Sequence, residues 1–141
     1  MNQRQILFRG LTASNEWVEG DLFSSTSGKN TTYFILPKGV SYFDEYEQVK
    51  PESIGQFCGL HDKHGKRIFE GDVLKWTHTW DSYEADGEGS VEKSLNRSDV
   101  VCFYNESGFR YKNISQTISE SLKDGAEIIG NIHTNPEPLQ P

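Results

Sequence analysis

Glycine and other turn-forming residues divide this chain into short apolar segments, and this spacing restricts the folds open to it. The chain has 141 residues, and its 13 glycines are spread over the whole length. Short segments that are rich in β-branched and aromatic residues and are bounded by turn signals are typical of strands. Long stretches with a helical period are absent from the sequence. The sequence therefore predicts a mainly β fold of the β-rich α+β kind.

The turn signals also set the positions of the expected elements. Residues 6–9 are predicted to pair with 16–23 across a polar turn, and 24–30 (SSTSGKN) to form a flexible loop. Residues 81–99 carry six acids against two bases and almost no apolar side chains, which favours a solvated loop or a long hairpin tip. Further strands are expected at 31–36, 56–60, 66–69, 73–76, 99–104, 109–114 and 127–132, with a helical turn at 51–54 and a helix at 115–122.

Residues 59–76 (GLHDKHGKRIFEGDVLKW) contain the acids and histidines that most resemble catalytic residues. The pattern predicts a hairpin in which Asp62 caps the turn through its carboxylate and Gly65 takes a positive φ. Gly71 and Asp72 are predicted to form a second tight turn. Glu70 and Asp72 are the pair that acid–base chemistry would use. We interpret all these residues as structural and predict no catalytic residue.

Charge limits the partners of the chain. The formal net charge is −7 and only 34% of residues are hydrophobic. An acidic chain is poorly suited to nonspecific binding of nucleic acid, which needs a basic surface. No apolar run is long enough for a signal peptide or a membrane span, and Cys58 and Cys102 alone make no disulfide framework. The sequence therefore predicts a cytoplasmic protein with no membrane partner.

Metal and cofactor sites are not expected. Cys58, His61 and His64 have ligand-like spacing, but a zinc site normally shows a second pair of close ligands and none is present. The acids Asp81, Glu84, Asp86, Glu88 and Glu92 do not fit the EF-hand pattern for calcium. Phosphate-binding glycine motifs and nucleophile motifs are also absent from the sequence. We therefore predict no metal, no cofactor and no enzymatic activity.

Aromatic and basic residues gather near residue 110 and supply the candidate binding residues. Strand alternation puts Phe109 and Tyr111 on one face and Arg110 and Lys112 on the other. One face must be core, and the other could form the peptide-binding or base-stacking groove that small barrels often carry. The candidate binding residues are Trp76, Tyr104, Arg110 and Lys112.

Three blocks of the sequence resemble the YopX family of phage and prophage proteins. They are ILFRG with WVEGDLF near the N-terminus, VKPESIGQFCGLHDKHGKRIFEGDVL at 49–74, and EIIGNIHTNPEPL at 127–139. His64 stands where the family usually has Asn, and Cys58 where Thr is common. The resemblance implies a phage-derived cytoplasmic protein with a β-rich fold whose second half is an SH3-like barrel. It brings no established activity and no catalytic residue.

These observations lead to one predicted organisation and one predicted role. The chain is expected to form an N-terminal β-subdomain at 1–55, an SH3-like barrel at 56–135 and an extended tail at 136–141. The predicted role is a phage accessory protein of the bacterial host cytoplasm that binds a host or phage protein. Open strand edges and a modest core also predict a homo-oligomer. The alternatives are a nucleic-acid-binding protein of phage replication or regulation, and a hydrolase or metal-dependent enzyme using Glu70, Asp72 or the histidines.

Overall fold

The computed structural model describes residues 5–39, 45–83, 87 and 89–134, and it is mainly β as predicted. The chain divides into two compact units, Met1–Gly59 and Leu60–Pro141, whereas the sequence suggested a boundary after residue 55. The predicted tail at 136–141 lies outside the described residues. Among the described residues, no helix is long and apolar enough to cross a membrane.

The first unit is an antiparallel sheet in which β5 pairs with the first strand. The sheet has six strands in the order β4-β3-β2-β1-β5-β6, and the last of them, β6 (Arg67–Phe69), belongs to the second unit. The other strands are β1 (Phe8–Leu11), β2 (Trp17–Ser27), β3 (Asn30–Pro37), β4 (Glu47–Val49) and β5 (Gly55–His61), and a 3-10 turn, η2 (Pro51–Ser53), precedes β5. Leu11, Ile35 and Val49 are buried in its core. Gly20 is required where β2 and β3 approach, because a Cβ there would lie 1.9 Å from the Leu36 carbonyl oxygen.

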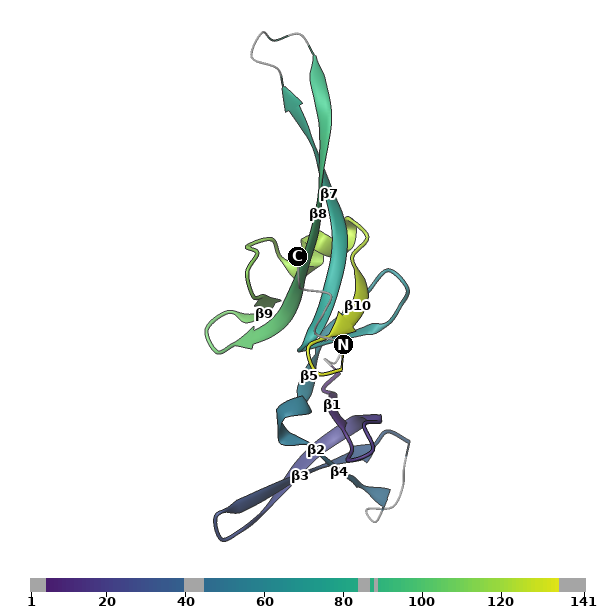
Figure 1. Cartoon of the computed structure of the whole chain (residues 1–141), viewed down its shortest axis with the longest axis vertical. Coiled ribbons are helices and arrows are strands. Elements are labelled where there is room, and N and C mark those ends of the chain that lie inside the picture. The colour runs from purple at the N-terminus through teal and green to yellow at the C-terminus, as the bar shows by residue number, and fades with distance from the viewer. Residues whose placement is uncertain (1–4, 40–44, 84–86, 88, 135–141) are drawn as a thin grey trace. The chain divides into compact units, whose positions relative to one another are not determined.

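The loop predicted at 24–30 is wrong, because these residues mostly continue β2 and β3. The two strands pair as far as Ser27 and Asn30, and only two residues connect them (Figure 1). The Ser and Thr side chains suggested a loop, yet the hydroxyls of Thr26 and Thr31 lie 3.0 Å apart across the strands. Cross-strand hydroxyl pairs of this kind stabilise a sheet that has little apolar surface.

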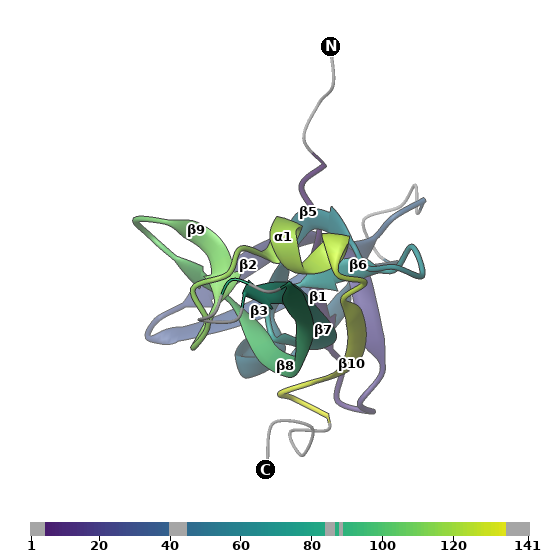
Figure 2. The ribbon, with the colours of Figure 1, turned by 90° about the horizontal axis from the view of Figure 1, so that it is seen from above.

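The second unit contains a four-stranded antiparallel sheet with the order β10-β7-β8-β9. Its elements are β6 (Arg67–Phe69), β7 (Asp72–Tyr83), β8 (Ser90–Tyr104), β9 (Gly108–Tyr111), α1 (Ile118–Lys123) and β10 (Glu127–Asn131). The described strands form no closed barrel, which corrects the SH3-like expectation. The reason is topological, since β9 and β10 are the two outer strands of this sheet and do not pair with each other (Figure 2).

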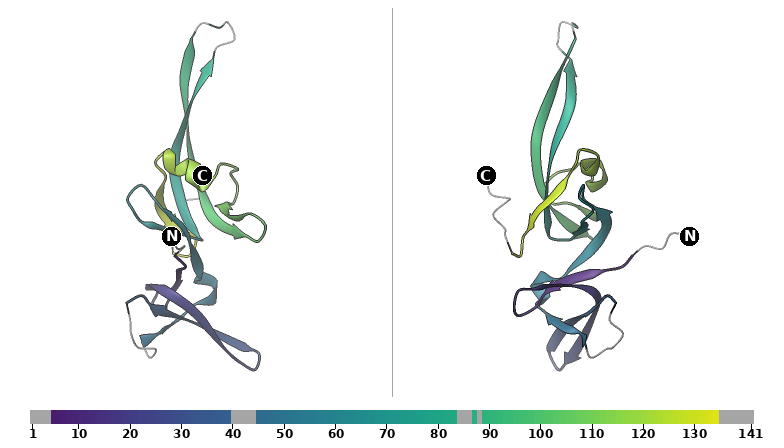
Figure 3. Two further views of the ribbon diagram at one scale, coloured as in Figure 1. Left: turned by 180° about the vertical axis from the view of Figure 1, so that it is seen from behind. Right: turned by 90° about the vertical axis from the view of Figure 1, so that its right-hand side faces the viewer.

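Strands β7 and β8 continue well beyond their neighbours. They pair from Val73 with Val100 to Tyr83 with Ser90, whereas β10 pairs with β7 only at 72–75 and β9 with β8 only at 101–104. We call the extension, residues 77–83 and 90–97, the ribbon (Figures 1 and 3). Of the two forms that the sequence left open for 81–99, a solvated loop or a long hairpin tip, most of the described residues adopt the hairpin. Residues 84–86 and 88 lie outside the described part of the chain.

The core of the second unit lies between one face of this sheet and α1. Trp76 and Tyr111 stack with their ring centroids 4.6 Å apart. The Tyr111 hydroxyl lies 2.6 Å from the Ser121 hydroxyl of α1, where both residues are buried. The helix begins after Thr117, whose side chain accepts the Glu120 N–H at 3.0 Å and caps the first turn. This packing fixes where the chain between β9 and α1 runs.

Candidate functional site

The hairpin turn after β5 is built around the buried carboxylate of Asp62. Its Oδ1 accepts the backbone N–H groups of His64 and Lys66, both at 2.9 Å, and its Oδ2 accepts that of Ile128 at 3.0 Å. Gly65 has φ +80°, which glycine adopts at little cost. Burial acts to raise the pKa of Asp62, but the three backbone bonds outweigh it and hold the pKa below its ordinary value. Asp62 thus joins the hairpin to β10.

The second turn, at Gly71 and Asp72, links β7 to its neighbours. Gly71 has φ +96°, and its N–H donates to the Val101 carbonyl at 2.8 Å. Asp72 is 1% exposed, and its Oδ2 accepts the Phe69 N–H at 2.8 Å. Neither Asp72 nor the half-buried Glu70 lines the depressions described below.

Trp76, one of the four candidate binding residues, lies in the core. It is 2% exposed, and its Nε1–H donates to the Gln116 side-chain oxygen at 3.1 Å. Trp76 was named as a candidate ligand contact, but a ligand on the surface does not reach a ring in this position. The reason is that β7 lies inside the sheet at this point and the ring faces Tyr111.

The other three candidates lie on or next to β9. The Arg110 guanidinium stands 4.4 Å from the centroid of the Tyr104 ring, within the range of a cation–π contact. Arg110 and Lys112 are exposed, and Tyr104 is half-buried. Tyr104 and Arg110 also line one surface depression of about 410 Å³. The structure therefore brings an aromatic ring and a cation together at this edge of the sheet.

A buried aspartate holds the segment that follows β9. We call residues 112–117 the β9–α1 loop. The Asp99 side chain is fully buried, and its Oδ2 accepts the backbone N–H groups of Asn113 and Ile114 at 2.7 and 2.8 Å. Its Oδ1 accepts the Val100 N–H at 2.8 Å and the Asn113 side-chain amide at 3.0 Å. Three of these four donors belong to the loop, so the carboxylate fixes the first half of the loop against β8.

The second half of the loop is held from the other side. The Gln116 side-chain amide donates to Asp124 Oδ2 at 3.1 Å, and the same oxygen lies 2.9 Å from His78 Nδ1. The hydrogen bond from His78, and after it the one from Gln116, lowers the pKa of Asp124. The loop is thus anchored at both ends by carboxylates that lie outside it.

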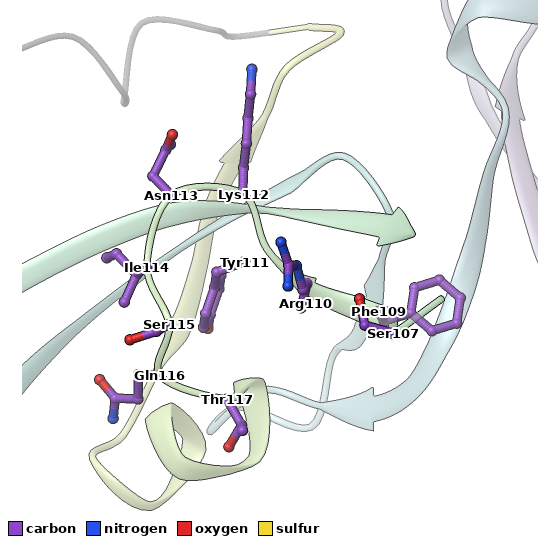
Figure 4. A pocket seen from close by; sticks show the side chains of 10 residues that line it. All are labelled: Ser107, Phe109, Arg110, Tyr111, Lys112, Asn113, Ile114, Ser115, Gln116 and Thr117. Carbon is purple, nitrogen blue, oxygen red and sulfur yellow. The ribbon is translucent and has the colours of Figure 1, made fainter. Parts of the chain in front are cut away.

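The anchored loop encloses a pocket of about 430 Å³, which we call the loop pocket (Figure 4). Its lining forms an arc from the end of β9, around the loop, to the start of α1. The lining residues are Ser107, Phe109, Arg110, Tyr111, Lys112, Asn113, Ile114, Ser115, Gln116 and Thr117.

A second and more open depression of about 560 Å³ lies on the other side of the same loop, along β8. We call it the edge depression. It shares Asn113, Ile114 and Ser115 with the loop pocket, and its other lining residues are Leu95, Asn96, Arg97 and Ser98. The Arg97 Nε is buried and has no hydrogen-bond partner among the described residues. An acceptor brought by a ligand would satisfy this donor.

The lining of these two depressions is positively charged, whereas the whole chain is negatively charged. Their lining residues include three cations, Arg97, Arg110 and Lys112, and no acid, although the whole chain carries a net charge of −7. The nearby Asp99 is buried and fully engaged with the loop. Guanidinium and ammonium groups beside hydroxyl and amide groups form a surface that suits carboxylates.

His64 and Cys102 are two of the residues considered for metal or nucleophilic chemistry, and both have contacts within the second unit. In the described part of the chain, no group of three or more His, Cys, Asp or Glu side chains is placed to hold a metal ion. His64 Nε2 lies 3.0 Å from Glu127 Oε2, and this bond, followed by the charge of Lys63, lowers the pKa of Glu127. Burial raises the pKa of the Cys102 thiol, which makes it a poorer nucleophile at neutral pH.

Sequence reasoning missed two residues that shape this surface. Asp99 was assigned only as the start of a strand, and Arg97 was placed in a solvated loop or hairpin tip. A signal was available for Asp99, because a carboxylate two positions before the apolar Val101 shares its face of the strand and must find donors there. No comparable signal marked Arg97, since its position depends on how far β8 extends.

Three comparisons relate the chain to known proteins. The model of the family described as YopX protein matches residues 7–140. A solved structure, the crystal structure of protein EF1440 from Enterococcus faecalis, has a TM-score of 0.53 and 24% sequence identity. That match covers 98% of this chain and 100% of the other, and it shows a shared fold. The comparison with curated proteins returned no match.

Proposed function

This chain belongs to the YopX family, and we propose that it is a phage or prophage accessory protein that binds a protein of the phage or of its bacterial host. In this proposal it acts in the host cytoplasm and catalyses no reaction. The observation that supports binding is the loop pocket, in which an acidic chain presents Arg110 and Lys112 without an acid among the lining residues.

The ligand that fits this pocket best is an acidic segment of a protein. Arg110 is exposed and oriented by the Tyr104 ring, and Lys112 follows two positions later, so both cations are accessible to carboxylates. The half-buried Phe109 and the loop hydroxyls add an apolar contact and polar groups to the same pocket. Pockets of this composition orient a ligand through a few polar groups.

Nucleic acid fits less well. Phosphate backbones require several cations spread along a track, and binding then falls steeply with salt. The exposed acids Asp81 and Glu92 lie opposite each other on the ribbon. These acids would repel a nucleic acid laid along the ribbon beside the pocket.

The test is affinity capture from lysate of the infected or lysogenic host, with and without nuclease. The bait proteins are wild type, Lys112→Glu and Lys29→Glu. Lys29 is an exposed lysine of the first unit, so its variant makes the same charge change away from the pocket. The proposal expects a protein that survives nuclease and is held by wild type and Lys29→Glu but lost with Lys112→Glu. Capture only through intact nucleic acid, or equal capture by all three baits, would contradict it.

Self-association is also part of the proposal. Among the described strands, the outer strands β4, β6, β9 and β10 each have a single neighbour within their sheets, and uncovered edges of this kind are often paired in an oligomer. Sedimentation of the purified chain at increasing concentration tests this point. A species of only 16.0 kDa throughout would rule it out without affecting the binding proposal.

A further inference from the structure

The β8 strand has an open edge beside the edge depression. Val100 directs its backbone toward the β9 side, because its carbonyl accepts the Lys112 N–H at 3.0 Å and its N–H donates to Asp99. Alternate residues of a strand direct their backbone groups to the same side. Asn96 and Ser98 therefore present their N–H and C=O groups to this side, where β9 no longer runs. Within the described residues, no hydrogen bond reaches these groups.

The side chains along this edge follow a regular order. Val91, Lys93, Leu95 and Arg97 lie at alternate positions and thus on one face of the ribbon, opposite Ser82, Trp80, His78 and Trp76 of β7. Val91 and Leu95 are 46% and 47% exposed. The face thus alternates apolar and basic residues along β8. No acid lies on this face of the paired β7 and β8 residues except Asp99, which is buried.

A two-stranded ribbon with open edges and an uncovered apolar face is an incomplete sheet. Isolated pairs of strands are marginally stable in water, and open edges readily accept another strand. The Arg97 Nε, buried without an acceptor next to the open edge, adds a specific reason for a ligand to carry an oxyanion.

We propose that the open edge of β8 binds an extended segment of a partner protein as an added strand. The segment carries acidic side chains next to Arg97 and Lys93 and an apolar side chain between them next to Leu95. Its backbone pairs with the outward groups of Asn96 and Ser98. This inference shares with the proposed function the premise that the chain binds a protein, and it uses the β8 edge, which borders the loop pocket at Asn113, Ile114 and Ser115.

A second copy of the chain is a less suitable occupant of this edge. Antiparallel pairing of two β8 edges about Leu95 would place Lys93 of each copy opposite Arg97 of the other. Like charges directly opposite each other on one face destabilise a sheet. The two cations of this edge instead favour a strand that carries acidic side chains opposite them.

The probe is a capped peptide, acetyl-Thr-Glu-Thr-Val-Thr-Glu-Thr-amide, in which Glu, Val and Glu share one face. It is titrated into the ¹⁵N-labelled full chain by NMR. The expected result is a set of amide shifts at residues 93–98 with slower hydrogen exchange at Asn96 and Ser98. Lys93→Glu should weaken binding about fivefold, and a peptide with Lys in place of Glu should not bind. Absence of shifts at these residues at millimolar peptide would overturn the proposal.

A matched pair of proline variants isolates strand addition from simple charge attraction. Asn96→Pro removes an outward N–H from the β8 edge, whereas Thr79→Pro does the same on the opposite edge of the ribbon, where β7 faces away from β8. Both leave the backbone hydrogen bonds between β7 and β8 in place. Asn96→Pro also removes the side-chain bond from Thr77, and Thr77→Ala, which removes the same bond but keeps the Asn96 N–H, is the control for that loss. The proposal expects Asn96→Pro to abolish binding and Thr79→Pro to retain it. Equal binding by both would overturn it.

The same titration separates this inference from the proposed function. Shifts confined to the loop pocket, and lost with Lys112→Glu, would support an acidic ligand there and reject the strand-addition site. Shifts at 93–98 that survive Lys112→Glu would support strand addition independently of the loop pocket.

Discussion

The two ends of the β7–β8 pair have the same register but different neighbours. At one end Val73, Leu74 and Val100 are 3% exposed or less, between β9, β10 and α1. At the other end the ribbon has no third strand, and its Trp80 and Leu95 are 42% and 47% exposed. The alternation of side chains continues unchanged along both strands. What changes is whether anything covers the face that the alternation creates.

This difference indicates that one end of the β7–β8 pair forms the core of the second unit, whereas the ribbon at the other end leaves apolar side chains exposed. Apolar side chains stabilise a fold only when their area leaves water. Trp76 does so against Tyr111, whereas among the described rings Trp80 on the same face stacks only on His78, at 5.7 Å between centroids. Four predictions test how far this division extends.

Replacing the tryptophan at each end should give very different losses of stability. Trp76→Ala removes a buried ring and its bond to Gln116, and we expect a loss of about 3–5 kcal/mol in the free energy of unfolding. Trp80→Ala removes a ring from the same face of the ribbon, and we expect a loss below about 1 kcal/mol. Urea unfolding followed by circular dichroism measures both. Similar losses would mean that the ribbon is part of the cooperative core.

The two aspartates of the strand pair offer a second contrast. Asp99→Asn places an amide where four donors converge, and we expect a loss of about 2–3 kcal/mol. Asp81 lies on the ribbon opposite Glu92, so Asp81→Asn relieves a like-charge pair and should be neutral or slightly stabilising. Equilibrium unfolding gives both values, and amide shifts of residues 113–115 report whether the β9–α1 loop moves in Asp99→Asn. An unshifted loop would contradict the anchoring role of Asp99.

Asp62 should make the stability of the second unit sensitive to acid. Its pKa is lowered in the folded state, so its carboxylate stabilises the fold above the unfolded pKa of about 3.9. This contribution is lost as the pH falls through the folded pKa. Between pH 5 and the acid limit of the folded state, the wild type should lose more stability than Asp62→Asn, which cannot titrate there. Unfolding midpoints across this range test the difference, and parallel curves would contradict it.

The sequence predicted the fold where burial and turn chemistry agree. The mainly β class and the family are confirmed, and the expected strand at 31–36 lies within β3. Prediction failed at 24–30, where a polar pair of strands was taken for a loop, and at 81–99 a solvated loop and a long hairpin tip were both left open. The reason is that composition alone cannot distinguish a solvated strand from a loop. The partner strand, which lies elsewhere in the sequence or across a turn, decides between them.

The candidate surface was only partly predictable for the same reason. Arg110 and Lys112 were named from the alternation of aromatic and basic residues, and the structure places both at the surface. Trp76, named with them as a candidate, is buried and stacks on Tyr111. Arg97 and Asp99 acquire their surroundings from the β9–α1 loop. Contacts between segments this far apart leave no pattern in either segment by itself.

The smallest expected effect concerns the ribbon by itself. Thr77 donates its hydroxyl to the Asn96 side-chain oxygen at 2.7 Å across the two strands, where both side chains are exposed. Thr77→Ala removes this cross-strand bond, and we expect a local loss of about 0.5 kcal/mol. Because the ribbon has few buried contacts, it should open without unfolding the rest of the unit. Faster hydrogen exchange confined to residues 77–83 and 90–97, with an unchanged midpoint of urea unfolding, is therefore expected. An equal change in the exchange of Val73, Leu74 and Val100 would show that the two ends of the strand pair unfold together, and the distinction between a stabilised end and an exposed end would not hold.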